Sequence, residues 1–199
     1  MDQALADYKA KGIEAKGYIC DVTDEEQVKN MVADIEKELG VIDILVNNAG
    51  IIKRIPMTEM SVDDFKQVID IDLTAPFIVS KAVIPGMIKK GHGKIINICS
   101  MMSELGRETI SAYAAAKGGL KMLTRNICSE YGEYNIQCNG LGLVTSQLLR
   151  QHLSVSVRLM VAVIHSTALS VQRLLQVAGW NPKSWQVLLF SWLQMLLMQ

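Results

Sequence analysis

Short apolar and β-branched runs alternate with longer stretches of helical periodicity through the first 142 residues of the chain. The runs at residues 13–21, 42–48, 93–100 and 135–140 each predict a buried strand. The stretches between them repeat apolar residues at helical spacing. Because strands that alternate with helices form βαβ units, the pattern predicts an α/β fold built on a parallel sheet.

The segment after the first predicted strand has a helix start signal and one apolar face. Thr23 and Glu26 are three residues apart, which is the spacing of a capping box between side chains and backbone amides. A helix that begins here places one set of apolar residues on a single face. These residues are Val28, Met31, Val32, Ile35 and Leu39.

Two longer helices are predicted further along the chain. Ser61 is expected to cap a helix that runs to Ile88 and bends before Pro76 and before Pro85. Residues 111–132, which begin with an alanine-rich stretch, form the second of these helices. Together with the strands, they account for residues 1–142 as one partial domain.

The composition restricts the classes of partner and site. A formal net charge of +0 and a pI near 6.8 over 199 residues give no electrostatic basis for binding nucleic acid or an anionic membrane. The widely spaced Cys20, Cys99, Cys128 and Cys138 indicate neither a zinc site nor a disulfide framework. The charged, helix-like N-terminus has no apolar signal core. We therefore expect a cytoplasmic protein without a bound metal.

Charged residues are distributed unevenly along the chain. All 20 acidic residues lie at or before Glu133, whereas residues 143–199 carry four basic residues, no acidic residue and all three tryptophans. Residues 184–199 are uncharged and rich in apolar residues, but they fall short of the roughly 20 residues that a membrane-spanning helix needs. The shift indicates a boundary at Gly142, between the partial α/β domain in residues 1–142 and a different tail in residues 143–199.

Ser100, Tyr113 and Lys117 are the candidates for chemistry. Tyr113 and Lys117 are four residues apart on a predicted helix and therefore share one face. An isolated tyrosine, with a pKa near 10, is too weak an acid for proton transfer at neutral pH, but a nearby ammonium stabilises the phenolate. Ser100 ends a predicted strand, where parallel sheets present ligand-facing groups. Taken singly, each residue also fits a surface pair or a turn.

With NNAG at residues 47–50, and with Tyr113 standing 13 positions after Ser100 (113−100), the pattern resembles the short-chain dehydrogenase/reductase family. The resemblance implies a Rossmann-type doubly wound parallel sheet, homo-oligomers, and hydride transfer between a substrate carbon and NAD or NADP. It also implies that Tyr113 exchanges the proton of the substrate hydroxyl. Lys117 would then make the tyrosine more acidic and bind the nicotinamide ribose, and Ser100 would orient the reacting oxygen.

The same resemblance implies contacts with the cofactor. Asp21 and Val22 match the segment that lies along the adenine. Asn48, Ala49 and Gly50 match a loop whose small residues let the backbone approach the cofactor.

Asp72 departs from the family pattern, which commonly has an asparagine at this position in a water-linked proton relay. A carboxylate can still accept hydrogen bonds, so Asp72 remains a candidate catalytic residue. The stretches around NNAG and Tyr113 further resemble the gluconate 5-dehydrogenases and their deoxygluconate relatives, which implies a sugar-acid substrate. The substrate carboxylate would suit a guanidinium group, and Arg54 and Arg107 are the candidates, although both also fit solvated surface arginines.

Both ends of the chain depart from the family. The family begins with a strand, a glycine-rich TGxxxGIG turn that holds the cofactor pyrophosphate, and a further strand, and we expect these first two strands to be missing here. After Gly142 the family continues with a Pro-Gly turn. For one permitted choice of codons, residues 143–151 read one base out of frame give PGYIATPQT, which is similar to that turn. We therefore predict a frame shift near Gly142 and a chain that folds poorly or is inactive.

Three functions remain open at this point. The first is a dehydrogenase that interconverts gluconate and 5-ketogluconate, and the second is a deoxygluconate or 3-oxoacyl-thioester reductase of the same family. The third is a non-catalytic partner that pairs with a full-length homologue through its two long helices. Cofactor-dependent turnover distinguishes the first two functions from the third.

Overall fold

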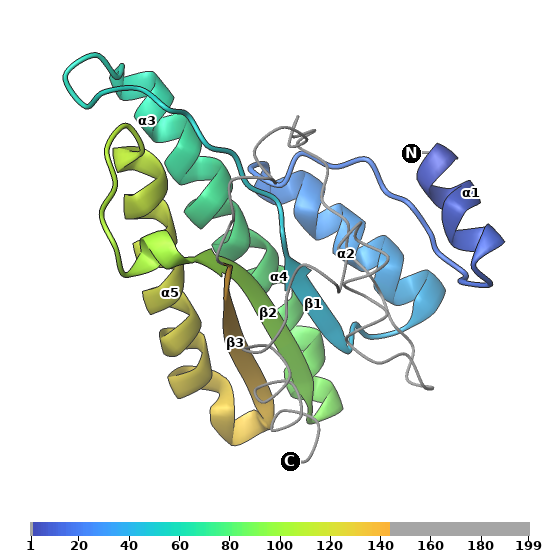
Figure 1. Ribbon diagram of the computed structural model, residues 1–199. Helices are drawn as coiled ribbons and strands as arrows, with labels where there is room; N and C mark the ends of the chain where they lie inside the picture. Colours follow the sequence, from blue (N-terminus) through green and yellow to red (C-terminus); the bar gives the residue numbers. More distant parts are fainter. Residues whose placement is uncertain (1, 144–199) are drawn as a thin grey trace. The chain divides into compact units, whose positions relative to one another are not determined.

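The structure is a computed structural model that describes residues 2–143 (Figure 1). Of these residues, 2–15 belong to one compact unit and 16–143 to a second. The predicted tail beyond Leu143 and the proposed shift of reading frame lie outside the described residues. The second unit contains the sheet and the candidate site.

Helix α1, Asp2–Ala10, belongs to the first unit. Its last turn ends with hydrogen bonds of 3.0 Å from the amides of Lys11 and Ile13 to the carbonyl of Tyr8. Gly12 follows with a φ of +71°, a left-handed conformation that glycine adopts without a steric cost. The helical character expected of the N-terminus is confirmed.

Residues 13–21 form no strand, so the first predicted strand is wrong. A strand requires a hydrogen-bonded neighbour, and within residues 2–143 no other strand pairs with this segment. The segment ends in a turn at Asp21, whose Oδ1 accepts hydrogen bonds from the amide and the hydroxyl of Thr23, at 2.9 and 2.7 Å. Apolar alternation alone therefore did not decide the secondary structure here.

Helix α2, Glu25–Leu39, is capped by Asp24. Its Oδ1 accepts hydrogen bonds from the amides of Glu26 and Gln27, at 3.0 and 3.1 Å. The predicted capping box is wrong, because the hydroxyl of Thr23 is already bonded to the preceding turn and the next residue offers a carboxylate. The predicted buried face is confirmed for Val28, Met31, Val32 and Ile35, whereas Leu39 is half-buried.

Three parallel strands form the sheet in the order β1-β2-β3 (Figure 1). They are β1, Ile44–Asn47, β2, Gly93–Ser100, and β3, Ile136–Leu143. Asn47 pairs with Asn97, and Asn97 pairs with Gly140. The last three predicted strands and the parallel sheet are confirmed, and the order agrees with three adjacent strands of a doubly wound Rossmann-type sheet.

A long helical segment connects β1 to β2. It comprises α3, Val62–Ile69, the π-helix η1, Asp70–Thr74, and α4, Ala75–Lys90. The predicted cap is confirmed, since the Oγ of Ser61 accepts a hydrogen bond of 3.0 Å from the amide of Asp64. The π-helix ends just before Pro76, where the missing N–H of proline interrupts the α-helical ladder.

The same segment, Val62–Lys90, has the length and composition of a membrane-spanning helix. However, 61% of its most apolar window is buried inside the protein. Val79, Val83 and Met87 of α4 pack in the main hydrophobic core, together with residues of α2 and of the sheet. The apolar surface of this segment is therefore explained by packing in the core.

Helix α5, Ser111–Tyr131, connects β2 to β3 and is flanked by the short 3-10 helices η2, Met101–Ser103, and η3, Gly132–Tyr134. Asn47 donates a hydrogen bond to Ser80 of α4, and Asn97 donates one to Thr124 of α5. Because paired residues of neighbouring strands point to the same face of a sheet, α4 and α5 cover the same face. Helix α5 contacts α3 and η1, the part of the same helical segment that precedes α4 (Figure 1).

Candidate active site

Lys117 is a buried lysine at the carboxyl end of the sheet. Its Nζ donates a hydrogen bond of 2.9 Å to the carbonyl of Ile98 in β2, and it lies 3.2 Å from Oδ2 of Asp72 in η1. The side chains of Lys117 and Asp72 are 6% and 0% exposed. Burial lowers the local dielectric constant, so the attraction between the two charges is stronger than in a surface pair. Helix, strand and π-helix together fix the position of the ammonium.

Asp72 connects the π-helix to the NNAG loop. Its Oδ1 accepts a hydrogen bond of 2.7 Å from the amide of Ile51, directly after that loop. A Cβ atom on Gly50 would lie 3.0 Å from Oδ2 of Asp72, so the close approach of loop and carboxylate requires glycine here. Burial raises the pKa of Asp72, while Lys117 and the amide of Ile51 oppose that rise.

Tyr113 lies in the first turn of α5, and its ring centroid is 5.6 Å from Nζ of Lys117. The predicted proximity of the two side chains is confirmed. The ring is half-buried and packs beside a small apolar cluster made by Val68, Ala112 and Ala116. A phenol in this position is partly open to solvent and lies beside a fixed ammonium, an arrangement that suits a proton donor or acceptor.

Ser100 ends β2 and caps the short helix η2. Its Oγ accepts a hydrogen bond of 3.2 Å from the amide of Met102, and its own amide donates one of 3.3 Å to Oγ of Ser103. Within residues 2–143, the structure gives Ser100 no hydrogen bond to Tyr113 or to Lys117. The structure therefore supports its position at the end of the strand and leaves its catalytic role a prediction.

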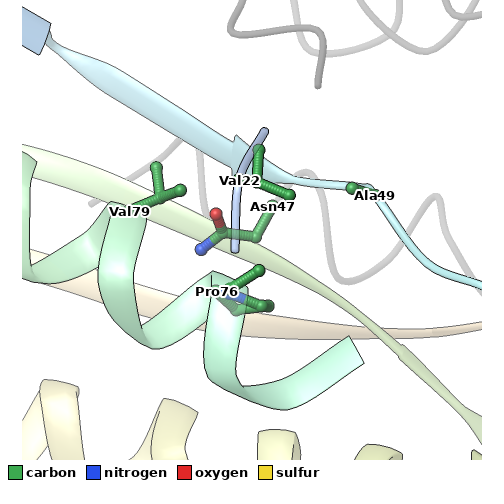
Figure 2. A pocket seen from close by; sticks show the side chains of 6 residues that line it. Val22, Asn47, Ala49, Pro76 and Val79 are labelled. Atoms are coloured by element: carbon green, nitrogen blue, oxygen red, sulfur yellow. The ribbon is translucent and has the colours of Figure 1, made fainter. Parts of the chain in front are cut away.

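Val22 and Ala49, both predicted to contact the cofactor, line one small pocket together with Asn47 (Figure 2). Pro76 and Val79 of α4 also line this pocket and are labelled in Figure 2. The other predicted cofactor residues lie near this pocket in the sequence but do not line it: Asp21, Asn48 and Gly50. Because Val22 and Asn47 line the same pocket, the turn after Asp21 lies next to the carboxyl end of β1.

Arg54 and Arg107 are both exposed, and neither forms an ion pair with another described residue. Their loops are joined by a backbone hydrogen bond of 2.9 Å, from the amide of Ile55 to the carbonyl of Thr109. The predicted arginines therefore lie on two connected loops, and both guanidinium groups are free to meet an anion.

The sequence model of the short chain dehydrogenase family matches residues 1–152, which is more than half of the chain. The chain belongs to the short chain dehydrogenase family. The match supports the Rossmann-type fold and the oxidoreductase class that the motifs imply.

Several relatives of this family member have names that refer to sugar acids. The chain is 60% identical to the 2-dehydro-3-deoxy-D-gluconate 5-dehydrogenase of Formosa agariphila over 142 residues, which cover 71% of the chain and 54% of that protein. The structure of a gluconate 5-dehydrogenase from Burkholderia cenocepacia in complex with NADP and tartrate has a TM-score of 0.69 and 42% identity, over 74% of this chain and 59% of that one. A 2-keto-3-deoxy-D-gluconate dehydrogenase structure from Streptococcus agalactiae has a TM-score of 0.60 and 70% identity, over 74% and 56%. The chain thus spans little more than half the length of these relatives.

A buried polar network in this family member was missed by sequence reasoning. Asn47 donates hydrogen bonds to Oδ1 of Asn97, at 2.8 Å, and to Oγ of Ser80, at 3.2 Å. Asn97 in turn donates to Oγ1 of Thr124, at 2.9 Å. All four side chains are buried. The signal available in the sequence was an asparagine inside each of two apolar strands, because a buried amide requires partners.

The cysteines within residues 2–143 are all free, and no group of three or more His, Cys, Asp or Glu side chains in this part could hold a metal. Burial raises the pKa of the Cys138 thiol to about 12, and burial also raises the pKa of Cys99. Both thiols are therefore protonated at neutral pH and are poor nucleophiles.

Proposed function

We propose that this protein is an oxidoreductase that transfers a hydride between NAD or NADP and the alcohol or ketone of a sugar acid. The substrate pair is gluconate and 5-ketogluconate. The observation that carries the proposal is the placement of Tyr113 beside the buried ammonium of Lys117, in a chain related to sugar-acid dehydrogenases. A cytoplasmic location and a homo-oligomeric assembly belong to the same proposal.

Each candidate residue has a defined task in this reaction. Tyr113 removes the proton of the substrate hydroxyl during oxidation and returns it during reduction. Lys117, fixed by Ile98 and Asp72, stabilises the phenolate form of the tyrosine. Ser100 orients the reacting oxygen through its hydroxyl, at the end of β2.

The nicotinamide cofactor supplies the hydride acceptor or donor when it is bound. The residues present would hold it in two groups: Tyr113 and Lys117 on the nicotinamide side, and the turn and loop residues on the adenine side, namely Asp21, Val22, Asn48, Ala49 and Gly50. The fit is supported by the small pocket that Val22 and Ala49 line together, because it places the turn and the NNAG loop next to each other.

Arg54 and Arg107 would bind the carboxylate of the substrate. Both guanidinium groups lack an ionic partner in the described part of the chain, and their loops are tied together by the Ile55–Thr109 hydrogen bond. A carboxylate accepts paired hydrogen bonds from a guanidinium fork, so two arginines on connected loops suit an acidic sugar.

Deoxygluconate is a second candidate substrate within the same class. The relatives that are 60% and 70% identical are both named as dehydrogenases of a keto-deoxygluconate. The gluconate 5-dehydrogenase structure is 42% identical. The two substrates share the carboxylate and differ at the two carbons next to it, where the deoxy acid has a ketone and a methylene group in place of hydroxyls, so comparing kcat/KM separates them.

Turnover of these sugar acids by the 199-residue chain, with NAD and with NADP, tests the proposal. We expect oxidation of the substrate, measured by the absorbance of the reduced nicotinamide. Tyr113→Phe should abolish this activity. Tyr134→Phe, which changes an exposed tyrosine outside the site, should leave it unchanged. Such turnover would also correct the expectation of an inactive chain. A folded chain that turns over none of these substrates would overturn the proposal and favour the non-catalytic partner.

A further inference from the structure

The buried partner of Lys117 is an acidic side chain, which carries a full negative charge when it is ionised. Oδ2 of Asp72 lies 3.2 Å from the ammonium, and both side chains are almost completely removed from solvent. The carboxylate is held in place by the amide of Ile51, which donates to its other oxygen. Asparagine, its neutral isostere, could accept the same hydrogen bond from the amide. The negative charge of Asp72 therefore needs an explanation beyond the geometry of the loop.

The charged and titratable groups around this pair are few. On α5, Tyr113 lies with its ring centroid 5.6 Å from the ammonium. On β2, the carbonyl of Ile98 accepts a hydrogen bond from Lys117, and the pKa of the neighbouring Cys99 is raised by burial, so this thiol is neutral at physiological pH. From the NNAG loop, the backbone around Gly50 faces the carboxylate. Among the described residues, Lys117 is thus the charge beside the ring of Tyr113, and Asp72 is the charge paired with Lys117.

The effect of such a pair on the phenol follows from electrostatics. A lone ammonium close to a phenol favours the phenolate, because opposite charges attract strongly where water is excluded. A carboxylate at 3.2 Å from the same ammonium turns the single charge into a dipole, whose field falls off faster with distance. The phenol therefore experiences less of the positive charge than Lys117 alone would provide.

We propose that Asp72 partly neutralises Lys117 through this buried ion pair and so raises the pH at which Tyr113 releases its proton. Asp72 is then a positioning residue that acts on the reaction through Lys117. As a statement about catalysis, this inference rests on the proposed function, because it concerns the proton that Tyr113 exchanges with the substrate. As a statement about Tyr113 itself, it can be tested without cofactor or substrate.

The first experiment follows the ionisation of Tyr113 by NMR in protein labelled with ¹³C at the ring carbon that bears the hydroxyl. The chain has five tyrosines, and the spectrum of Tyr113→Phe identifies the signal of Tyr113. In Asp72→Asn, the midpoint for Tyr113 is expected to fall by about one pH unit, since one unit charge is removed near the ammonium. The matched control is Asp70→Asn, which removes the same charge from an exposed position of the same π-helix and should leave the midpoint unchanged.

An unchanged or higher midpoint in a folded Asp72→Asn variant would overturn the inference. If this variant does not fold, the double variant Asp72→Asn with Lys117→Gln provides the test, because it leaves no unpaired charge buried. In this double variant, the midpoint for the ionisation of Tyr113 is expected to stay near its value in the unmodified chain. A rise as large as that caused by Lys117→Gln alone would show that Asp72 does not oppose the ammonium.

The same variants separate this inference from the proposed function. If the midpoints move as expected but no sugar acid is turned over, the proposed function fails and the charge compensation stands. If turnover is found and the midpoints do not move, the inference fails and the function stands. In an active chain, Asp72→Asn should also shift the rising limb of the pH profile for oxidation to lower pH.

Discussion

The amide of Ile55 donates a 2.9 Å hydrogen bond to the carbonyl of Thr109, which joins two loops more than fifty residues apart in the sequence. Each loop carries one exposed arginine, at positions 54 and 107. Thr109 adopts a φ of +65°, a left-handed conformation that is costly for a β-branched residue. A strained residue that holds a long-range contact is typical of a functional loop.

The first prediction concerns these two arginines. Arg54→Gln and Arg107→Gln should each raise KM for a sugar acid about tenfold or more, because a hydrogen bond to a charged group is worth about 1.5–3 kcal/mol. If both guanidinium groups bind one carboxylate, the double variant should lose less than the sum of the two effects. Steady-state kinetics with gluconate and with its keto acid measure KM in the single and double variants.

Arg125→Gln is the matched control, since this arginine is exposed on α5 and lies outside both loops. Arg54→Lys keeps the charge but lacks the planar fork, so it should recover only part of the loss. An unchanged KM in both single variants would show that the arginines are solvated surface residues.

The second prediction tests the contact between Gly50 and Asp72. In Gly50→Ala the added Cβ would lie 3.0 Å from Oδ2 of Asp72, so a carboxylate that is held by Lys117 and by the amide of Ile51 would have to shift. We expect a loss of unfolding free energy of about 1–3 kcal/mol, the range typical of overpacking a tight site. Urea denaturation followed by circular dichroism provides the measurement.

Gly118→Ala serves as the control for that substitution. This glycine lies inside α5, and a Cβ there would meet no atom within 4 Å. Alanine should therefore stabilise the helix by about 0.5–1 kcal/mol, because glycine loses more backbone entropy on folding. If both alanine variants changed stability in the same direction, the specific role given to Gly50 would be wrong.

Local patterns predicted much of the fold and part of the site. The three strands of the sheet, the cap at Ser61 and the pairing of Tyr113 with Lys117 all follow from residues close in sequence, so their spacing was sufficient. Residues 13–21 have the alternation of a strand, but strand formation depends on a distant neighbour that no local pattern reveals.

The ion pair of Asp72 and Lys117 was likewise beyond local reasoning. The two residues are 45 positions apart (117−72) and meet only because the π-helix and α5 pack at the same end of the sheet. Sequence comparison with the family indicated that Asp72 was unusual. It did not indicate which basic residue would pair with the carboxylate. Tertiary packing determines this ion pair, and the ion pair in turn determines the electrostatics of the site.

The third prediction concerns the polar network across the sheet. Asn97→Ala removes one hydrogen-bond partner each from Asn47 and Thr124, both of which are buried. Because unsatisfied buried groups cost about 1–3 kcal/mol each, the free energy of unfolding should fall by about 2–4 kcal/mol. Asn126→Ala, at an exposed position of α5, should change it by no more than about 0.5 kcal/mol. Comparable losses in the two variants would contradict a structural role for the network.

The last prediction is a pH dependence of helix α2. Hydrogen bonds from the amides of Gln27 and Glu26, together with the Gln27 side chain, hold the pKa of the Asp24 carboxyl below its ordinary value. A carboxyl whose pKa is lower in the folded state contributes stability above its unfolded pKa, and that contribution is lost as the pH falls through the folded pKa. Asp24→Asn keeps an acceptor for the helix amides but cannot ionise in this range. The unmodified chain should therefore be more stable than Asp24→Asn at neutral pH. This difference in stability should vanish when the pH falls below the range in which aspartate ordinarily ionises.

Thermal unfolding of both chains across that pH range measures the difference in stability. A difference that stays constant with pH would show that the cap acts without its charge.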